Sequence, residues 1–342
     1  MKPARLLLLV CFALFLGCHA KRVLPKASSP ACSRAYPSGA LAALDGTATL
    51  GGEPVASVED CEIPHFFAPD PPNWGTTGWL STQFLSAPVH GTNYGSFQFW
   101  SYLAVYFVVP PYPPVAPSDT SQNIGFFPAI ESAPQAFYPR ILQPVLYYGN
   151  HGGTLGWWVT AILNQDSDPS AGPQQNSPVV QVHPGDGLVG LIRMVTKFPD
   201  NSDGHYVYEV SIQPFNGLDG PGNPAITQMQ FSVVSSWLPN TISPMALESQ
   251  SVPVASCGLL PGNNAMGYAV LGMGIPQIPN NPTAEFTDGN NSIMVAGFWN
   301  NDGSYTDVGS KRTGGCSADS VYRTNPSAPW NGSLTWNASG SP

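Results

Sequence analysis

The stretch FQFWSYLAVYFVV, residues 97–109, is the strongest structural signal in the chain, and Pro110 and Pro111 follow it at once. It is rich in aromatic and β-branched residues, which fit the pleated surface of a sheet. The two prolines then end the pattern. We therefore expect one long bent strand or a strand pair here.

Similar apolar runs follow towards the C-terminus, separated by Pro-Gly-Asp, Asn-Gly and Asp-Gly turns. Strands are expected at residues 141–148, 156–163, 179–182, 187–194, 206–213, 228–235, 244–252, 267–273 and 293–299. Short strands at intervals of roughly ten residues, with no long helical pattern, predict an all-β sandwich or jelly roll.

Composition limits the class of protein. The 342 residues include 35 Gly and 37 Pro, which leave few places for a long helix. Only 10% of residues are charged and the formal net charge is −9, so no nucleic-acid partner is expected. A chain with few carboxylates loses little native-state electrostatic stabilisation on acidification, which is compatible with an acidic working environment.

The N-terminus has the organisation of a secretory signal. A short basic region (residues 1–5) precedes an apolar run (residues 6–17), and CHA at residues 18–20 offers a cleavage site after the alanine. We expect residues 1–20 to be a signal peptide and the protein to be secreted and extracellular. A bacterial lipoprotein box at residues 16–18 is the alternative. No later stretch reaches the ~18 apolar residues of a membrane span. We also expect the protein to be a monomer.

Three segments follow the signal. Residues 21–85 are rich in Pro, Ala, Ser and Gly and begin with a dibasic pair, so they predict an N-terminal extension or a pro-region. Residues 86–300 hold the expected strands and form the β-sandwich domain. Residues 301–342 are a polar C-terminal tail.

Four cysteines remain after signal removal, namely Cys32, Cys61, Cys257 and Cys316. In a secreted chain an even number predicts disulfides, here two with three possible connectivities. We favour the local pairing of Cys32 with Cys61 and of Cys257 with Cys316. The sequons at Asn290, Asn331 and Asn337 are glycosylation candidates in a eukaryotic host.

Several catalytic motifs are absent from the sequence. It contains no Gly-x-Ser-x-Gly elbow, no His-Glu-x-x-His and no paired Asp-Thr/Ser-Gly loops. No strand carries carboxylates on alternate residues, as a jelly-roll glycosidase would. What remains is one carboxamide, Gln143, and one carboxylate, Glu248, in otherwise apolar strands.

An ordered set of short motifs surrounds these two residues. It consists of Asn93-Tyr94-Gly95, residues 104–110, Ile141-Leu142-Gln143, Tyr148-Gly149, Trp157-Trp158, Gly185-Asp186, residues 243–248 and Leu260-Pro261. In order and spacing the set resembles the glutamic peptidases (eqolisins), over about half of the chain. There Ile-Leu-Gln carries the catalytic glutamine, and Glu248 falls on the catalytic glutamate.

The resemblance implies a concanavalin A-like two-sheet antiparallel β-sandwich, a jelly roll, with a substrate groove. It implies an acid-acting secreted endopeptidase that cleaves proteins or peptides. Glu248 would act as general base on a water, and Gln143 would stabilise the oxyanion, with no metal or cofactor. Trp157, Trp158 and Tyr148 are the candidates for lining the groove.

The chain also departs from the family pattern. Residues 123–128 stand where the family has Trp-x-Gly-x-Asp-Gly, Val159 replaces a glutamate, and Pro244 replaces the first glutamate of the Ala-Glu strand. Losing such supporting polar groups lowers the expected rate or removes activity. The alternative is therefore a non-catalytic, lectin-like β-sandwich that binds glycans or peptides.

Overall fold

The computed structural model describes the chain over residues 32–43, 45–63, 79–83, 85–86, 99–117, 123–131, 140–164, 174–195, 205–215, 225–234, 239–249, 256–276, 292–294, 311–313, 315–323 and 330–341. The signal peptide and the sequon at Asn290 lie outside these residues.

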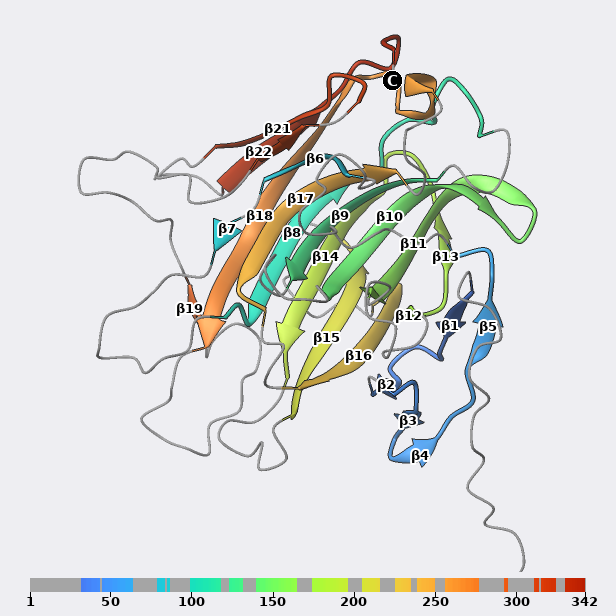
Figure 1. The fold of residues 1–342 in the computed structure, drawn as a ribbon, viewed down its shortest axis with the longest axis vertical. Coiled ribbons are helices and arrows are strands. Elements are labelled where there is room, and N and C mark those ends of the chain that lie inside the picture. Colours follow the sequence, from blue (N-terminus) through green and yellow to red (C-terminus); the bar gives the residue numbers. More distant parts are fainter. Residues whose placement is uncertain are drawn as a thin grey trace, which may run out of the picture.

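The described strands form two sheets (Figure 1). Sheet 1 is ordered β20 (Lys311–Thr313), β6 (Trp79–Gln83), β17 (Thr241–Ser249), β9 (Ile124–Glu131), β10 (Ile141–His151), β11 (Thr154–Asn164), β12 (Gln175–Asn176), β1 (Ser33–Ala35) and β5 (Val58–Asp60), with β7 (Leu85–Ser86) beside β17 and β13 (Val180–Val182) beside β11. Sheet 2 is ordered β21 (Asp319–Arg323), β22 (Trp330–Thr335), β18 (Ala265–Pro276), β8 (Tyr102–Val108), β14 (Gly187–Met194), β15 (His205–Pro214), β16 (Thr227–Val234), β2 (Leu41–Ala42), β3 (Ala48–Leu50) and β4 (Glu53–Pro54), with β19 (Ser292–Met294) beside β18.

Among the strands that the structure describes, neighbours are antiparallel except at two places, where β1 pairs with β12 and β2 with β16 in parallel. This architecture confirms the expected all-β, two-sheet sandwich. In the part of the chain that is described, the helical element is a single 3-10 turn, η3 (Cys257–Leu259). None of the described residues form a helix long and apolar enough to cross a membrane.

Strand alternation explains how the core forms. On β10, Leu142 and Leu146 point towards sheet 2 and join the main hydrophobic core with residues such as Phe107 of β8 and Ile192 of β14. Their neighbours point the other way, because successive side chains of a strand alternate between faces. We call the face of sheet 1 that points away from sheet 2 its outer face.

The two sheets approach closely at Gly190 of β14. A Cβ there would lie 2.9 Å from Cγ of Pro128 on β9 and 3.0 Å from Cγ of Pro144 on β10. Only a residue without a side chain accepts both proline rings at this distance. The even-numbered positions of β9 and β10 therefore face sheet 2, which leaves the odd-numbered positions on the outer face.

Strands from all three predicted segments pair in the same two sheets. Within residues 21–85, β1 and β5 extend sheet 1 while β2, β3 and β4 extend sheet 2, and Tyr36 and Ala40 are buried in the main core. Within residues 301–342, β20 pairs with β6 and β22 pairs with β18. The division of the chain into extension, sandwich and tail stays a prediction.

Both disulfides follow the expected local pairing. Cys32 is bonded to Cys61 and Cys257 to Cys316, at sequence separations of 29 and 59 residues. The first ties β1 to the chain after β5, and the second ties η3 to the turn before β21. Two disulfides are typical of proteins that mature in an oxidising compartment.

Candidate active site

Gln143 lies on the outer face of sheet 1, near the start of the central strand β10. Its neighbours Ile141, Val145 and Tyr147 on that face form a second hydrophobic cluster with residues of β9, β11 and β17. The Gln143 side chain is 0% exposed. Neither Oε1 nor Nε2 has a hydrogen-bond partner among the residues that the structure describes.

A buried amide with no hydrogen-bond partner among the described residues is unusual for a protein interior. Leaving a buried polar group without a partner costs about 1–3 kcal/mol, and most buried polar groups avoid that cost. Gln143 is therefore a candidate for contact with a ligand or a bound water.

Glu248 lies on β17, two strands away from β10. It pairs with Gly125 of β9 and with Trp79 of β6, and it is 0% exposed. Gly125 is an odd-numbered residue of β9, so Glu248 and Gln143 occupy the same outer face.

The register nevertheless separates these two residues. Gln143 lies opposite Ala129 of β9, because the pairs Leu142↔Ile130 and Leu146↔Phe126 flank it without an inserted residue. Glu248 is level with Gly125, four residues further along β9. That offset is roughly 13 Å along the strands, and two strand spacings add roughly 10 Å across them. The structure therefore does not bring the two predicted dyad members side by side.

Three prolines interrupt the strand ladders beside Gln143. Pro144 lies opposite Pro128, and the β9–β10 pairing stops at Leu142 and resumes at Leu146. On the other side of β9, Pro244 and Met245 of β17 both lie opposite Pro128, which makes a β-bulge. Proline has no N–H to donate and is rare in central strands, while bulges are frequent next to active sites. The interrupted ladders and the buried Gln143 side chain therefore lie at the same position of sheet 1.

Polar side chains surround Ala129 at this interruption. Ser243 of β17 pairs directly with Ala129, and Gln143 lies opposite it on β10. One step along the same face, Glu131 of β9 pairs with Thr241 of β17. All four polar residues are at most 3% exposed. Of these four residues, only Gln143 is predicted from the sequence as a site residue. Gly125 and Pro128 interrupt the apolar pattern of β9, the strand that carries Glu131, so the sequence did not predict that strand.

The three predicted groove residues divide between the two faces. Trp158 lies on the outer face opposite Tyr147, and its Nε1 donates a 3.2 Å hydrogen bond to the carbonyl of Gly149. Trp157 and Tyr148 instead pack against each other in the main core, with ring centroids 5.2 Å apart. Only Trp158 of the three therefore shares the face of Gln143.

Tyr147 contributes a hydroxyl on the same face, level with Glu248. Burial raises the pKa of Tyr147 well above its ordinary value of 10.0, and the nearby carboxylates of Asp60 and Glu62 raise it further. The phenol therefore stays protonated and neutral at acidic and neutral pH. Burial also raises the pKa of Tyr208, in the core, well above that value, and Tyr206 adds to the effect.

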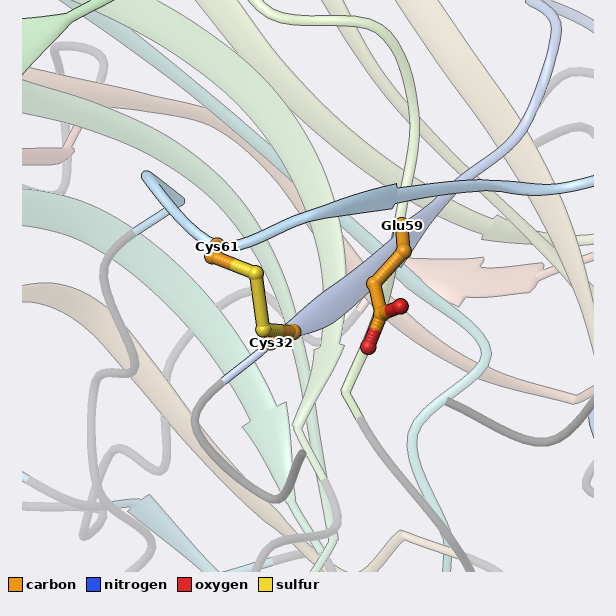
Figure 2. A group of neighbouring side chains, drawn as sticks. All are labelled: Cys32, Glu59 and Cys61. Atoms are coloured by element: carbon orange, nitrogen blue, oxygen red, sulfur yellow. A yellow bond between two sulfur atoms is a disulfide. The ribbon is translucent and has the colours of Figure 1, made fainter. Parts of the chain in front are cut away.

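Figure 2 shows Cys32, Glu59 and Cys61, a group with metal-ligand chemistry at the N-terminal strands. The two sulfur atoms are bonded to each other, so neither is a thiolate that could hold a metal ion. We interpret this cluster as structural.

Of the remaining sequons, Asn331 lies within β22, and Asn337 is exposed in a turn where its Oδ1 accepts a 3.1 Å hydrogen bond from the Ser339 amide.

Comparison with known proteins gives a distant structural likeness. No family model and no curated protein matches the chain. Among solved structures, a scytalido-glutamic peptidase with a peptide-based transition-state analogue is similar at a TM-score of 0.39 and 12% identity, over 76% of this chain and 99% of that one. SCP-B, a member of the eqolisin family of peptidases in complex with the tripeptide Ala-Ile-His, is similar at a TM-score of 0.36 and 12% identity, with the same coverage.

Proposed function

We propose that the protein is a secreted, acid-acting endopeptidase of the glutamic type, in which Gln143 works with a buried carboxylate to hydrolyse peptide bonds. The observation that supports it best is the Gln143 amide, fully buried on a central strand and unpaired among the described residues. The motif resemblance names the same residue. It assigns the carboxylate role to Glu248, which lies on the same face.

The chemistry needs no metal. The carboxylate takes a proton from a water, whose oxygen bonds to the carbonyl carbon of the substrate. The carbonyl oxygen becomes an oxyanion, and Nε2 of Gln143 donates a hydrogen bond to it. The C–N bond then breaks, and the carboxyl group passes its proton to the leaving amine. Gln143 is neutral at every pH, so the base alone sets the acid limit of activity.

Access to this site requires a structural change. Gln143 and Glu248 are both 0% exposed, so a substrate reaches them only if the side chains packed around them move. The test therefore uses protein secreted through its own signal and first incubated in acid, as well as protein that has not been acid-treated.

The experiment is cleavage of denatured casein between about pH 2 and pH 6, with pepstatin present to silence aspartic proteases. Cleavage that Gln143→Ala abolishes supports the proposal, and Glu248→Gln tests the carboxylate that the resemblance names. Gln213→Ala is the matched control, because Gln213 is a partly buried strand glutamine of sheet 2. A folded protein that cleaves nothing at any pH contradicts the proposal and leaves a non-catalytic binding sandwich.

A further inference from the structure

The last residue of β9, Glu131, is a buried carboxylate on the outer face of sheet 1 that the motif resemblance does not assign. It is 1% exposed. It pairs with Thr241 of β17 on one side and with Ile141 of β10 on the other. Ile141 belongs to the outer-face cluster, which places Glu131 on the face of Gln143.

Glu131 is a diagonal cross-strand neighbour of Gln143. Gln143 lies opposite Ala129, and Glu131 is two residues further along the same strand. Such diagonal neighbours are about 7–8 Å apart at the backbone, within reach of two long side chains that meet above the sheet. Glu248 is twice as far along the strands and one strand further away, so Glu131 is the carboxylate better placed to meet the Gln143 amide.

Small and polar side chains lie beside Gln143 and Glu131 on this face. Ala129, between Gln143 and Ser243, carries only a methyl group. Thr241 and Ser243 add hydroxyl groups on the far side, both at most 3% exposed. The Thr241 hydroxyl donates to Oδ1 of Asn240 at 3.1 Å, so its oxygen offers an acceptor. Together with the Glu131 carboxylate, the Gln143 carboxamide and the Ser243 hydroxyl, it belongs to the set of two to four polar partners that a bound water needs.

We propose that Glu131 is the carboxylate that shares a water with Gln143 and acts as the general base, an inference that rests on the proposed peptidase function. Glu131 takes a proton from the water, and the water oxygen bonds to the substrate carbonyl carbon. Gln143 stabilises the oxyanion. When the C–N bond breaks, Glu131 returns the proton to the amine, so one water is consumed and a carboxylic acid and an amine are released.

The first test compares Glu131→Gln with wild-type protein in the casein assay. Loss of a general base lowers the rate about 100- to 10,000-fold, so we expect at least a 100-fold fall in kcat. The control is Glu209→Gln, since Glu209 is a buried carboxylate of sheet 2 that pairs with Arg193 at 2.9 Å. Near-wild-type activity in Glu131→Gln, with loss in Glu248→Gln, overturns the inference and leaves the peptidase function standing. An inactive wild-type protein overturns both.

A second variant separates a catalytic role from a structural one. Glu131→Ala leaves a cavity that formate can enter, and formate can then act as the base. We expect formate to raise the activity of Glu131→Ala at least tenfold and to leave Gln143→Ala unchanged. Failure of formate to rescue a folded Glu131→Ala contradicts the proposed role.

A third measurement uses protein stability, so it does not depend on enzymatic activity or on the result for any single variant. Unfolding of Glu131→Gln, Gln143→Leu and the double variant forms a double-mutant cycle. Groups that share a water are coupled, so we expect the changes in the unfolding equilibrium constant to be non-additive by about threefold or more. Additive effects, like those expected for Gln143→Leu with Glu209→Gln, show that the two groups do not meet and overturn the inference.

Discussion

The side chain of Asn123 lies across Gly149, in the space that a Cβ on Gly149 would occupy. Asn123 immediately precedes β9, and Gly149 lies on β10 in the Tyr-Gly step of the family-like motif. The carbonyl of the same glycine accepts the hydrogen bond from Trp158. Asn123 and Trp158 therefore both lie against Gly149, at one end of the outer face.

Gly149→Ala is predicted to destabilise the protein by about 1–3 kcal/mol, because the added methyl group collides with the Asn123 side chain. Urea denaturation measures the change in the free energy of unfolding. In the double variant Gly149→Ala/Asn123→Ala the obstructing atoms are gone, so the two changes should cost less together than their sum. Strict additivity would show that Asn123 is not the obstacle.

Gly190→Ala is predicted to cost about 1–3 kcal/mol, because its methyl group meets the rigid rings of Pro128 and Pro144 and forces the sheets apart. Gly267→Ala is the matched control, since Gly267 is a strand glycine of β18 with nothing within 4 Å of the added Cβ. We expect that control to unfold close to the wild-type midpoint. Equal stability of the two alanine variants would contradict the sheet contact.

Each disulfide is predicted to stabilise the fold by restricting the unfolded chain. Loop closure predicts a loss of about 3.5 kcal/mol for Cys32→Ser/Cys61→Ser and about 4 kcal/mol for Cys257→Ser/Cys316→Ser. Thermal unfolding of both double variants measures this. If Cys32→Ser/Cys61→Ser unfolds at the wild-type temperature, the N-terminal strands contribute little to the stability of the sandwich.

Alkaline pH is predicted to destabilise the protein through Tyr147 and Tyr208. Burial raises the pKa of both phenols well above 10.0 in the folded state, while the unfolded chain releases their protons near that pH. Above it the unfolded state binds fewer protons than the folded state, so the free energy of unfolding falls as pH rises.

Ultraviolet absorbance of tyrosinate measures this directly, since these two phenols should ionise only as the protein unfolds. Tyr147→Phe and Tyr208→Phe should each remove one group from that late phase. A titration in which every tyrosine ionises before the loss of structure would contradict the burial of these side chains.

Much of the fold could be predicted from the sequence, because strands such as β10, β11 and β14 are continuous apolar runs. β9 could not, since Gly125 and Pro128 interrupt an eight-residue strand that tertiary packing holds in place. Glu131 was missed with it. Alternation alone put the aromatic residues on both faces, and the sequence had no means of assigning Trp158 rather than Trp157 to the outer one.

The relative position of Gln143 and Glu248 could not be predicted for a different reason. It depends on how β17 is aligned against β9, and the bulge at Pro244 and Met245 shifts that alignment. A one-residue shift in pairing moves side chains to the other face, and motif order along the chain contains no information about such shifts.

The most direct test of the central claim is kcat/KM for a fluorogenic peptide at acidic pH, measured for wild type, Gln143→Ala and the control Gln213→Ala. Removing one oxyanion donor costs about 100- to 1,000-fold in kcat, so Gln143→Ala should lose at least 100-fold while Gln213→Ala keeps wild-type activity. A correctly folded Gln143→Ala that cleaves the peptide at the wild-type rate would contradict the account.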